Sequence, residues 1–218
     1  MPKRFELLVF DWDGTLMDSA GAIVASIQAS CRDLGLPVPD RERASHVIGL
    51  GLKDALSYAV PELPPSDYGK LAERYRYHYL ARDPDIELFP GMREMLAGLK
   101  QQGYLLAVAT GKSRVGLDRV LEATQLKQYF DSSRCADETH SKPNPAMLQE
   151  LMQELLTEPE ATLMIGDTAH DLQMALNAGV PALAVSYGAH PRDNLTALNP
   201  LDCIDTPQEL MQWLTRNA

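Results

Sequence analysis

The sequence predicts an α/β protein, a doubly wound parallel sheet with a block of helices inserted after its first strand. Two observations support this fold class. From residue 86 onward, short apolar runs alternate with stretches of helical spacing, an order typical of parallel sheets covered by helices. Between residues 17 and 85, helical spacing recurs without a convincing strand. We therefore expect an α/β core from residues 1–16 and 86–218, and a helical insert over residues 17–85.

The first strand is predicted over residues 5–10, an apolar run that ends at a turn around Gly14. The insert begins soon after, and Ser19 occupies the position expected for the N-cap of a helix. Apolar residues then recur at helical spacing at Ile23, Ile27, Cys31 and Leu34. Further helices are predicted over residues 40–47, 52–59 and 66–82, before Pro84, Pro90 and Gly91 mark the return to the core.

The second block continues the alternation. Strands are predicted over residues 104–109, 133–136, 161–165 and 180–185, with an edge strand at 203–204. Helices are predicted over residues 91–101, 113–124, 144–156, 168–178 and 207–216. Each of the inner strands is followed by polar residues, and these strand ends carry most of the functional information.

The composition narrows the class of protein. The chain has 218 residues, of which 45% are hydrophobic, and a net charge of −10. That charge argues against a nucleic-acid partner, which requires clustered basic residues. The three cysteines are far apart and form no CxxC pair, and no apolar run approaches the length of a membrane span. We expect a cytoplasmic, monomeric protein that binds neither nucleic acid nor membrane.

Two carboxylates follow the first strand, at Asp11 and Asp13 of the run Asp11-Trp12-Asp13-Gly14-Thr15-Leu16. Side chains alternate along a strand, so both carboxylates can leave the sheet edge on the same side. In open α/β sheets, ligands bind at the carboxyl ends of the strands. This spacing favours a nucleophile and an acid/base partner near a bound cation.

Three further strand ends carry polar groups. Thr110 and Gly111 precede a predicted helix, where a hydroxyl and backbone N–H groups suit an anion, although a simple helix cap is the alternative. Lys142 lies just before a helix start bounded by prolines, and it is either a solvated charge or a point charge for a phosphoryl oxygen. Asp167 and Asp171 flank a strand-to-helix turn and, with Asp11, form an oxygen donor set suited to Mg²⁺.

The order of these four motifs resembles that of the haloacid dehalogenase superfamily over the whole chain. Asp11 to Thr15 matches the family's DxDGT motif, Thr110 its second motif, Lys142 its third, and Asp167 with Asp171 its acidic fourth motif. The resemblance implies an α/β core with a small helical cap domain. It is nearest to phosphoglycolate phosphatases and β-phosphoglucomutases. Thr110-Gly111-Lys112 replaces the Thr-Asn found in many relatives.

The resemblance also implies roles for individual residues. Asp11 is the nucleophile that forms an aspartyl-phosphate, and Asp13 is the general acid and base. Mg²⁺ is held by Asp11, the backbone carbonyl of Asp13, Asp167, and Asp171 directly or through water. The phosphoryl oxygens are held by Thr110, Gly14, Gly111 and Lys142. The implied activity is Mg²⁺-dependent hydrolysis of a small phosphorylated metabolite.

Other interpretations remain open at the level of sequence. A sugar-phosphate mutase uses the same motifs, and a non-catalytic ligand-binding protein can retain the fold. Lys53, after Gly49 and Gly51, is either a substrate contact or a solvated charge. Tyr75, Tyr77 and Tyr79 alternate within one helix and so do not all share a face. The five histidines show no metal-ligand spacing and are expected to be structural or exposed; they are His46, His78, His140, His170 and His190.

Overall fold

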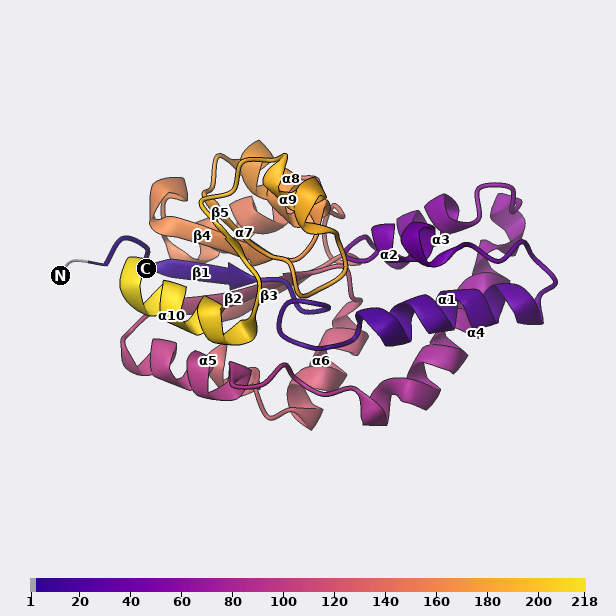
Figure 1. The fold of residues 1–218 in the computed structure, drawn as a ribbon, viewed down its shortest axis with the longest axis horizontal. Helices are drawn as coiled ribbons and strands as arrows, with labels where there is room; N and C mark the ends of the chain where they lie inside the picture. The colour runs from indigo at the N-terminus through magenta and orange to yellow at the C-terminus, as the bar shows by residue number, and fades with distance from the viewer. Residues whose placement is uncertain (1–2) are drawn as a thin grey trace.

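A computed structural model describes residues 3–218 and contains a six-stranded parallel sheet in the order β3-β2-β1-β4-β5-β6 (Figure 1). The predicted doubly wound fold is therefore confirmed. The strands are β1 (Leu7–Phe10), β2 (Leu105–Thr110), β3 (Ser132–Cys135), β4 (Thr162–Gly166), β5 (Ala182–Val185) and β6 (Cys203–Ile204). The order reverses next to β1, so the carboxyl ends of β1, β2 and β4 are neighbours at the topological switch point.

Helices fall into two groups. Those between and after the strands are α5 (Met92–Gln101), α6 (Arg114–Ala123), α7 (Ala146–Leu155), α8 (Ala169–Ala178), α9 (Arg192–Thr196) and α10 (Pro207–Asn217). Those of the second group lie between β1 and α5, and they are α1 (Ala20–Asp33), α2 (Arg41–His46), α3 (Leu52–Ala59) and α4 (Tyr68–Arg82). The short α9 was not predicted, because its five residues are too few for helical periodicity. Within residues 3–218, no helix has the length and apolar character needed to cross a membrane.

Alternation along β1 explains how the sheet is covered on both faces. Leu8 and Phe10 join a hydrophobic cluster that includes residues of α5, α6 and α10. Leu7 and Val9 point the other way and pack with residues of α7 and α8. All four residues have no exposed surface, and burial of such a side chain contributes about 1.5–3 kcal/mol. The central strand is thereby held rigidly between two helical layers.

Helices α1–α4 and their connections form a separate helical lobe beyond the carboxyl ends of the strands (Figure 1). This lobe has its own hydrophobic cluster, which includes Ile27 of α1, Leu56 of α3 and Leu71 of α4. The helices pack because each buries an apolar stripe that it cannot bury alone. The expected division into a core and an insert over residues 17–85 remains a prediction, which the separate cluster supports; residues 1–2 of the expected core lie outside the described chain.

Two connections join the helical lobe to the sheet, and they lie side by side. The amide of Asp18 donates to the carbonyl of Glu87 at 2.9 Å, and the amide of Phe89 donates to the carbonyl of Leu16 at 3.0 Å. Met17 and Leu88 form an antiparallel bridge between them. The two connections pair over only a few residues, so the junction between the lobe and the sheet is narrow.

Candidate active site

Three buried carboxylates meet at the carboxyl ends of β1 and β4. Asp11 directly follows β1, Asp167 directly follows β4, and Asp171 lies in the first turn of α8. One oxygen of each lies within 4.8 Å of one oxygen of the others, and all three residues have no exposed surface. Neighbouring parallel strands end at the same sheet edge, which is why residues so distant in sequence converge here.

Lys142 supplies a positive charge in this cluster. Its Nζ donates to Oδ1 of Asp11 at 2.7 Å and to Oδ1 of Asp171 at 2.6 Å. Burial alone lowers the pKa of a lysine, but the attraction of Asp11 and Asp171 outweighs it and raises the pKa of Lys142. Lys142 therefore stays charged and fixes the orientation of the Asp11 carboxylate.

The donor set fits a divalent cation. Oδ2 of Asp11 is buried and has no hydrogen-bond partner. Burial raises the pKa of Asp11 well above its usual value, and burial together with Asp171 raises the pKa of Asp167 to about 7. Three crowded carboxylates facing one lysine are an excess of negative charge in a dry site. A hard cation such as Mg²⁺, which prefers oxygen ligands, neutralises that excess.

Asp167 is oriented by groups on both sides. The hydroxyl of Thr15 donates to its Oδ1 at 2.8 Å, and the amide of Ala189 donates to its Oδ2 at 2.7 Å. Gly14 has φ +84° and lies so close to the Asp167 carboxylate that a Cβ at this position would clash with it. Sequence reasoning missed the roles of Thr15 and Ala189, although Thr15 is part of the motif after β1.

Both oxygens of Asp171 are engaged. Oδ1 accepts from Lys142, while Oδ2 accepts from the amide of Thr168 at 3.0 Å and from its hydroxyl at 2.6 Å. These contacts form a capping box at the start of α8, in which Thr168 is the N-cap. The first turn of the helix thus holds Asp171 rigidly beside Lys142.

Asp13 lies outside the three-carboxylate cluster and has different partners. Ser19 donates to its Oδ1 at 2.6 Å, and Nζ of Lys112 lies 2.9 Å from the same oxygen. Ser19 is the N-cap residue of α1, as expected, but its hydroxyl bonds to Asp13 and makes no cap bond to the helix. Nζ of Lys112 also donates to the Tyr79 hydroxyl at 3.0 Å, so Lys112 connects Asp13 to the helical lobe. The sequence places Lys112 in the motif that follows β2, but it does not predict the contact of Lys112 with Asp13 and Tyr79.

Thr110 and Gly111 lie at the end of β2. Thr110 is fully buried, and its hydroxyl accepts from the amide of Lys112 at 3.2 Å. Gly111 faces the loop between α2 and α3, where a Cβ would lie 2.5 Å from the Leu50 carbonyl oxygen and 2.6 Å from that of Gly49. Only glycine permits this close approach of the lobe to the strand end.

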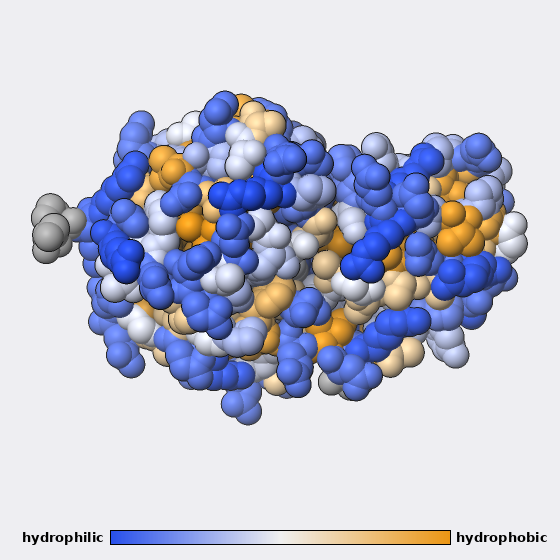
Figure 2. Space-filling model, viewed as in Figure 1, coloured by the Kyte–Doolittle hydropathy of each residue, from blue (hydrophilic) through white to orange (hydrophobic). Residues whose placement is uncertain are grey.

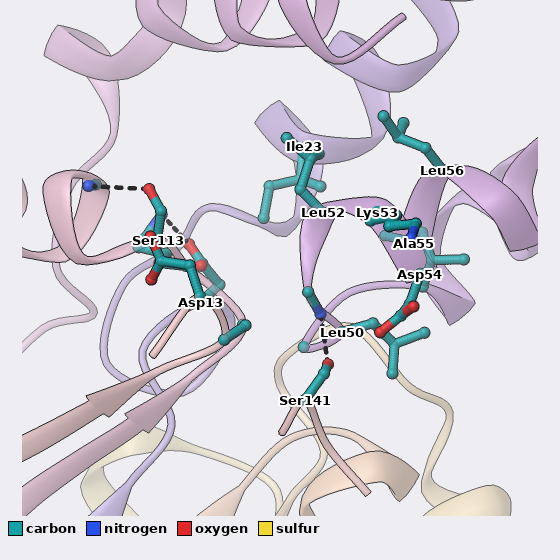
Figure 3. Close-up of a pocket in the computed structure, with 18 of the residues that line it drawn as sticks. Asp13, Ile23, Leu50, Leu52, Lys53, Asp54, Ala55, Leu56, Ser113 and Ser141 are labelled. Atoms are coloured by element: carbon teal, nitrogen blue, oxygen red, sulfur yellow. Dashed lines mark hydrogen bonds and ion pairs between the residues drawn. The ribbon is translucent and has the colours of Figure 1, made fainter. Parts of the chain in front are cut away.

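A cavity of about 860 Å³ lies between the helical lobe and the strand ends, and its lining includes Asp13, Lys112 and Lys53. Figure 3 shows Asp13 and Ser113 on one side of the cavity and Lys53 on α3 at the other side. The lobe is seated on the core beside it, where the amide of Gly51 donates to the Ser141 hydroxyl at 2.8 Å. The loop before α3 therefore faces the core, whereas the exposed Lys53 lies away from Asp13.

Three of the five histidines also meet at the junction of lobe and core, a proximity that their sequence spacing did not indicate. A nitrogen of each lies within 4.8 Å of a nitrogen of the others in His46, His170 and His190. Nε2 of His170 and Nε2 of His190 both donate to the carbonyl of His46, at 2.7 and 3.1 Å. Burial lowers the pKa of both donors, that of His190 to about 4. As neutral donors they fasten the lobe to the core.

Two of the three alternating tyrosines of α4 share a face. Tyr75 and Tyr79, one helical turn apart, stack with ring centroids 5.8 Å apart, while Tyr77 is 61% exposed. The hydroxyl of Tyr79 accepts from Lys112, and this contact joins α4 to the core.

Comparisons with known proteins agree with this site. The sequence pattern of the haloacid dehalogenase-like hydrolase family matches residues 8–185. The chain is 39% identical to the probable phosphatase IndB of Dickeya dadantii over 94% of this chain and 91% of that protein. It is 32% identical to a phosphoglycolate phosphatase of Agrobacterium fabrum over 84% of this chain and 81% of that one.

A solved structure shares the complete fold. It is described as a predicted phosphoglycolate phosphatase from Haemophilus somnus, with a TM-score of 0.85 and 25% sequence identity. The similarity covers 97% of this chain and 99% of the other. Together with the buried carboxylates at the ends of β1 and β4, these matches confirm the resemblance that the four motifs indicated: the chain belongs to the haloacid dehalogenase-like hydrolase family.

Proposed function

We propose that this protein is a phosphatase that hydrolyses a small phosphate monoester with Mg²⁺ through an aspartyl-phosphate on Asp11. The observation that carries the proposal is Oδ2 of Asp11, which is buried and without a partner while Lys142 holds Oδ1. A carboxylate oxygen kept free in this way is available to attack phosphorus. The relatives named as phosphatases support the reaction class.

Asp11 and Asp167, the backbone carbonyl of Asp13, and Asp171 directly or through water, are the groups that would hold Mg²⁺. When bound, the ion neutralises charge on the phosphoryl oxygens and on the crowded carboxylates. Asp11 attacks phosphorus and displaces the alcohol, and the aspartyl-phosphate is then hydrolysed. Covalent catalysis of this kind replaces one difficult step by two easier ones.

Asp13 is proposed as the general acid and base. It is separate from the three-carboxylate cluster and is held by Ser19 and Lys112 at the border of the large cavity. From this position it donates a proton to the departing alcohol and later removes one from water. Lys112 neutralises its ionised form between the two steps.

The phosphoryl group is proposed to be held by Thr110, Gly111 and Lys142. The expected contact with Gly14 is not retained, because its amide already donates to the carbonyl of Met17 at 2.8 Å. The buried hydroxyl and the lysine ammonium lie at adjacent strand ends, where they can donate to oxygens on which charge develops. These donors are held in position before substrate binds, so little reorganisation is needed in the transition state.

The helical lobe, residues 17–85, is proposed to act as a cap domain over the active site. It is joined to the core by the paired connections at Leu16–Asp18 and Glu87–Phe89 and seated through single hydrogen bonds such as that from Gly51 to Ser141. Closure excludes water during phosphoryl transfer, and reopening admits water and releases the product. We further propose a cytoplasmic monomer whose substrate is a phosphorylated metabolite.

The first test is hydrolysis of an aryl phosphate with Mg²⁺ and with a chelator. We expect turnover that depends on Mg²⁺. Acid quenching during turnover followed by borohydride reduction converts an aspartyl-phosphate to homoserine, which peptide mass spectrometry should find at position 11 only. Absence of turnover with Mg²⁺, or labelling at another aspartate, contradicts the proposal.

Two controls separate the alternative functions. A sugar-phosphate mutase would convert a hexose 1-phosphate into the 6-phosphate faster than it releases inorganic phosphate. A non-catalytic binding protein would bind phosphate esters without releasing phosphate from any of them. We expect release of inorganic phosphate to dominate with every substrate that is turned over.

A further inference from the structure

The cavity beside Asp13 is large for a short leaving group. At about 860 Å³ it lies in the upper part of the range for pockets that enclose drug-sized ligands. Glycolate, or the second phosphate of pyrophosphate, would fill a small part of it. The cavity persists although the helical lobe is seated on the core through Gly51 and Ser141 and through Gly49, Leu50 and Gly111. Its size is therefore a property of the walls of the seated lobe.

The wall that the lobe contributes is mainly apolar. It includes Ile23, Ile27, Val47, Ile48, Leu52 and Leu56, which except for Leu52 are buried in the hydrophobic cluster of the lobe. The stacked rings of Tyr75 and Tyr79 also line the cavity. Figure 2 shows apolar residues at the surface where the two parts of the molecule meet. Such a wall gains free energy from contact with apolar groups and none from contact with an anion.

The charges around the cavity are nearly balanced. The lining includes four lysine or arginine residues, Lys53, Arg76, Lys112 and Arg119, and three carboxylates, Asp13, Asp54 and Asp137. Lys112 is already paired with Asp13 at 2.9 Å, and Nη2 of Arg119 with Asp83 at 3.0 Å, although Nε of Arg119 is buried without a partner. Lys53 and Arg76 are exposed. Among the described residues that line the cavity, no cation is thus both buried and free of a carboxylate partner.

We propose that the leaving group is a bulky, uncharged alcohol that carries an aromatic or alicyclic ring, rather than a short anion such as glycolate or phosphate. The phosphoryl group lies at the strand ends, and the ring lies against the apolar wall formed by α1, α3 and α4. The inference rests on the proposed function, because it assigns the substrate class of the same site. It differs from the substrate named for the phosphoglycolate phosphatase of Agrobacterium fabrum, since glycolate is a small, anionic leaving group.

The test uses alkyl esters whose leaving groups have similar intrinsic reactivity and differ in size and charge. Ethyl, 2-phenylethyl and 2-(2-naphthyl)ethyl phosphate form the uncharged series, and phosphoglycolate is the anionic comparison. We expect kcat/KM to rise along the uncharged series by on the order of tenfold for each added ring. A flat series, or a preference for phosphoglycolate over the naphthylethyl ester, overturns the inference.

A substitution in the wall tests the location. Leu52→Trp puts a large side chain into the cavity at a partly buried position, so we expect the ratio of kcat/KM for the naphthylethyl ester to that for the ethyl ester to fall by about tenfold. Leu201→Trp is the matched control, because Leu201 is 42% exposed and does not line the cavity. Equal ratios in both variants and in the wild type contradict the assigned position of the ring.

Binding to the Asp11→Asn variant distinguishes failure of this inference from failure of the proposed function. Calorimetric titration with the ethyl and naphthylethyl phosphates measures affinity without turnover. If the naphthylethyl ester binds more tightly, and Leu52→Trp removes that advantage, the assigned ligand class holds even if the wild type hydrolyses no ester. If the wild type hydrolyses all the esters but affinity and kcat/KM do not depend on the ring, the phosphatase proposal stands and the substrate class is wrong.

Discussion

The α/β core and the helical lobe border the same cavity but differ in what they contribute to it. The core contributes charged groups that are fixed by buried contacts, as Asp13 is by Ser19 and Lys112. The lobe contributes apolar side chains such as Ile27 and Leu56. Burial raises the cost of moving the core groups, whereas the lobe is joined through two short connections. The comparison indicates that reaction chemistry and substrate choice reside in parts that can change independently.

Lys112 is the point where this separation is incomplete. It belongs to the core, yet it contacts both Asp13 and the hydroxyl of Tyr79 in the lobe. Burial tends to lower the pKa of Lys112, but the attraction of Asp13 and Tyr79 outweighs burial and raises it. Asp13, the proposed acid and base, is thus connected to Tyr79 of the lobe through Lys112 only when the lobe lies against the core. Substitutions in the core should therefore affect all substrates, and substitutions at the junction should affect them selectively.

The largest expected effect is that of Asp11→Asn in the core. An amide cannot act as the carboxylate nucleophile, and it weakens the cation site. We expect kcat to fall by on the order of a thousandfold or more for every ester, with the fold unchanged. Steady-state kinetics and circular dichroism check this, with the exposed Asp193→Asn as the matched control. A folded variant with near wild-type kcat and normal Mg²⁺ dependence would contradict the role of Asp11.

The next effect, at Asp13, should depend on the leaving group. An alkoxide needs a proton as the bond to phosphorus breaks, whereas a nitrophenolate hardly needs one. We expect Asp13→Asn to lower kcat by on the order of a hundredfold for an alkyl phosphate and by much less for nitrophenyl phosphate. Parallel kinetics with both esters measure the difference. Equal losses of kcat for the alkyl and the nitrophenyl ester would contradict the role of Asp13 as general acid and base.

A smaller effect is expected at Gly111, where core and lobe touch. In Gly111→Ala the new Cβ would lie 2.5 Å from the Leu50 carbonyl oxygen, so the lobe must shift outward. We expect kcat/KM to fall by about tenfold for large esters, because misplacing a binding wall is costly in the transition state. Gly98→Ala in α5 is the control, since no atom lies within 4 Å of its added Cβ. If both variants behave like the wild type, the contact does not matter for catalysis.

The pH dependence of stability should distinguish the carboxylate cluster from the rest of the core. Asp167 has a pKa raised to about 7, so the folded protein without metal holds this proton more tightly than the unfolded chain does. Its contribution to stability is fully present below about pH 4 and is lost as the pH rises through about 7. Mg²⁺ binds the ionised form, so the gain in Tm with Mg²⁺ should grow from about pH 5.5 to about pH 8, reaching on the order of 5 °C.

Differential scanning fluorimetry with and without Mg²⁺ measures this gain. Asp167→Asn should remove most of the gain and its pH dependence, because the variant has no carboxylate at the site to titrate. A Mg²⁺ effect that is the same at all pH values in the wild type would show that the ion binds elsewhere.

The smallest effect is expected at Lys53 in the lobe. This lysine is exposed and lies on the side of the cavity away from Asp13. Lys53→Ala should raise KM by about two- to threefold for esters long enough to reach it, in line with the small energies of exposed charges. Lys70→Ala, an exposed lysine of α4, is the control. An effect as large as that of Gly111→Ala would show that the lysine holds the leaving group directly.

The sequence by itself determined the doubly wound sheet, and it predicted the insert and the polar groups that follow the strands. These follow from local patterns: Asp11 and Asp13 alternate at the end of an apolar run, and Asp171 lies one helical turn from Asp167. Parallel strands end at one edge of the sheet, so the chemistry-bearing residues could be grouped without coordinates. Several predicted helix and strand boundaries differ from those in the structure by one or two residues, because the ends of an element depend on local hydrogen bonds.

Only the tertiary structure decided how the lobe meets the core. The hydroxyl of Ser19 bonds to Asp13 rather than to α1, Lys112 pairs with Asp13, and His46 meets two histidines of the core. No spacing in the sequence predicts these contacts, because each depends on how the lobe is oriented against the core. The size and apolar character of the cavity likewise arise from walls on both bodies, so the sequence carries no local pattern for them.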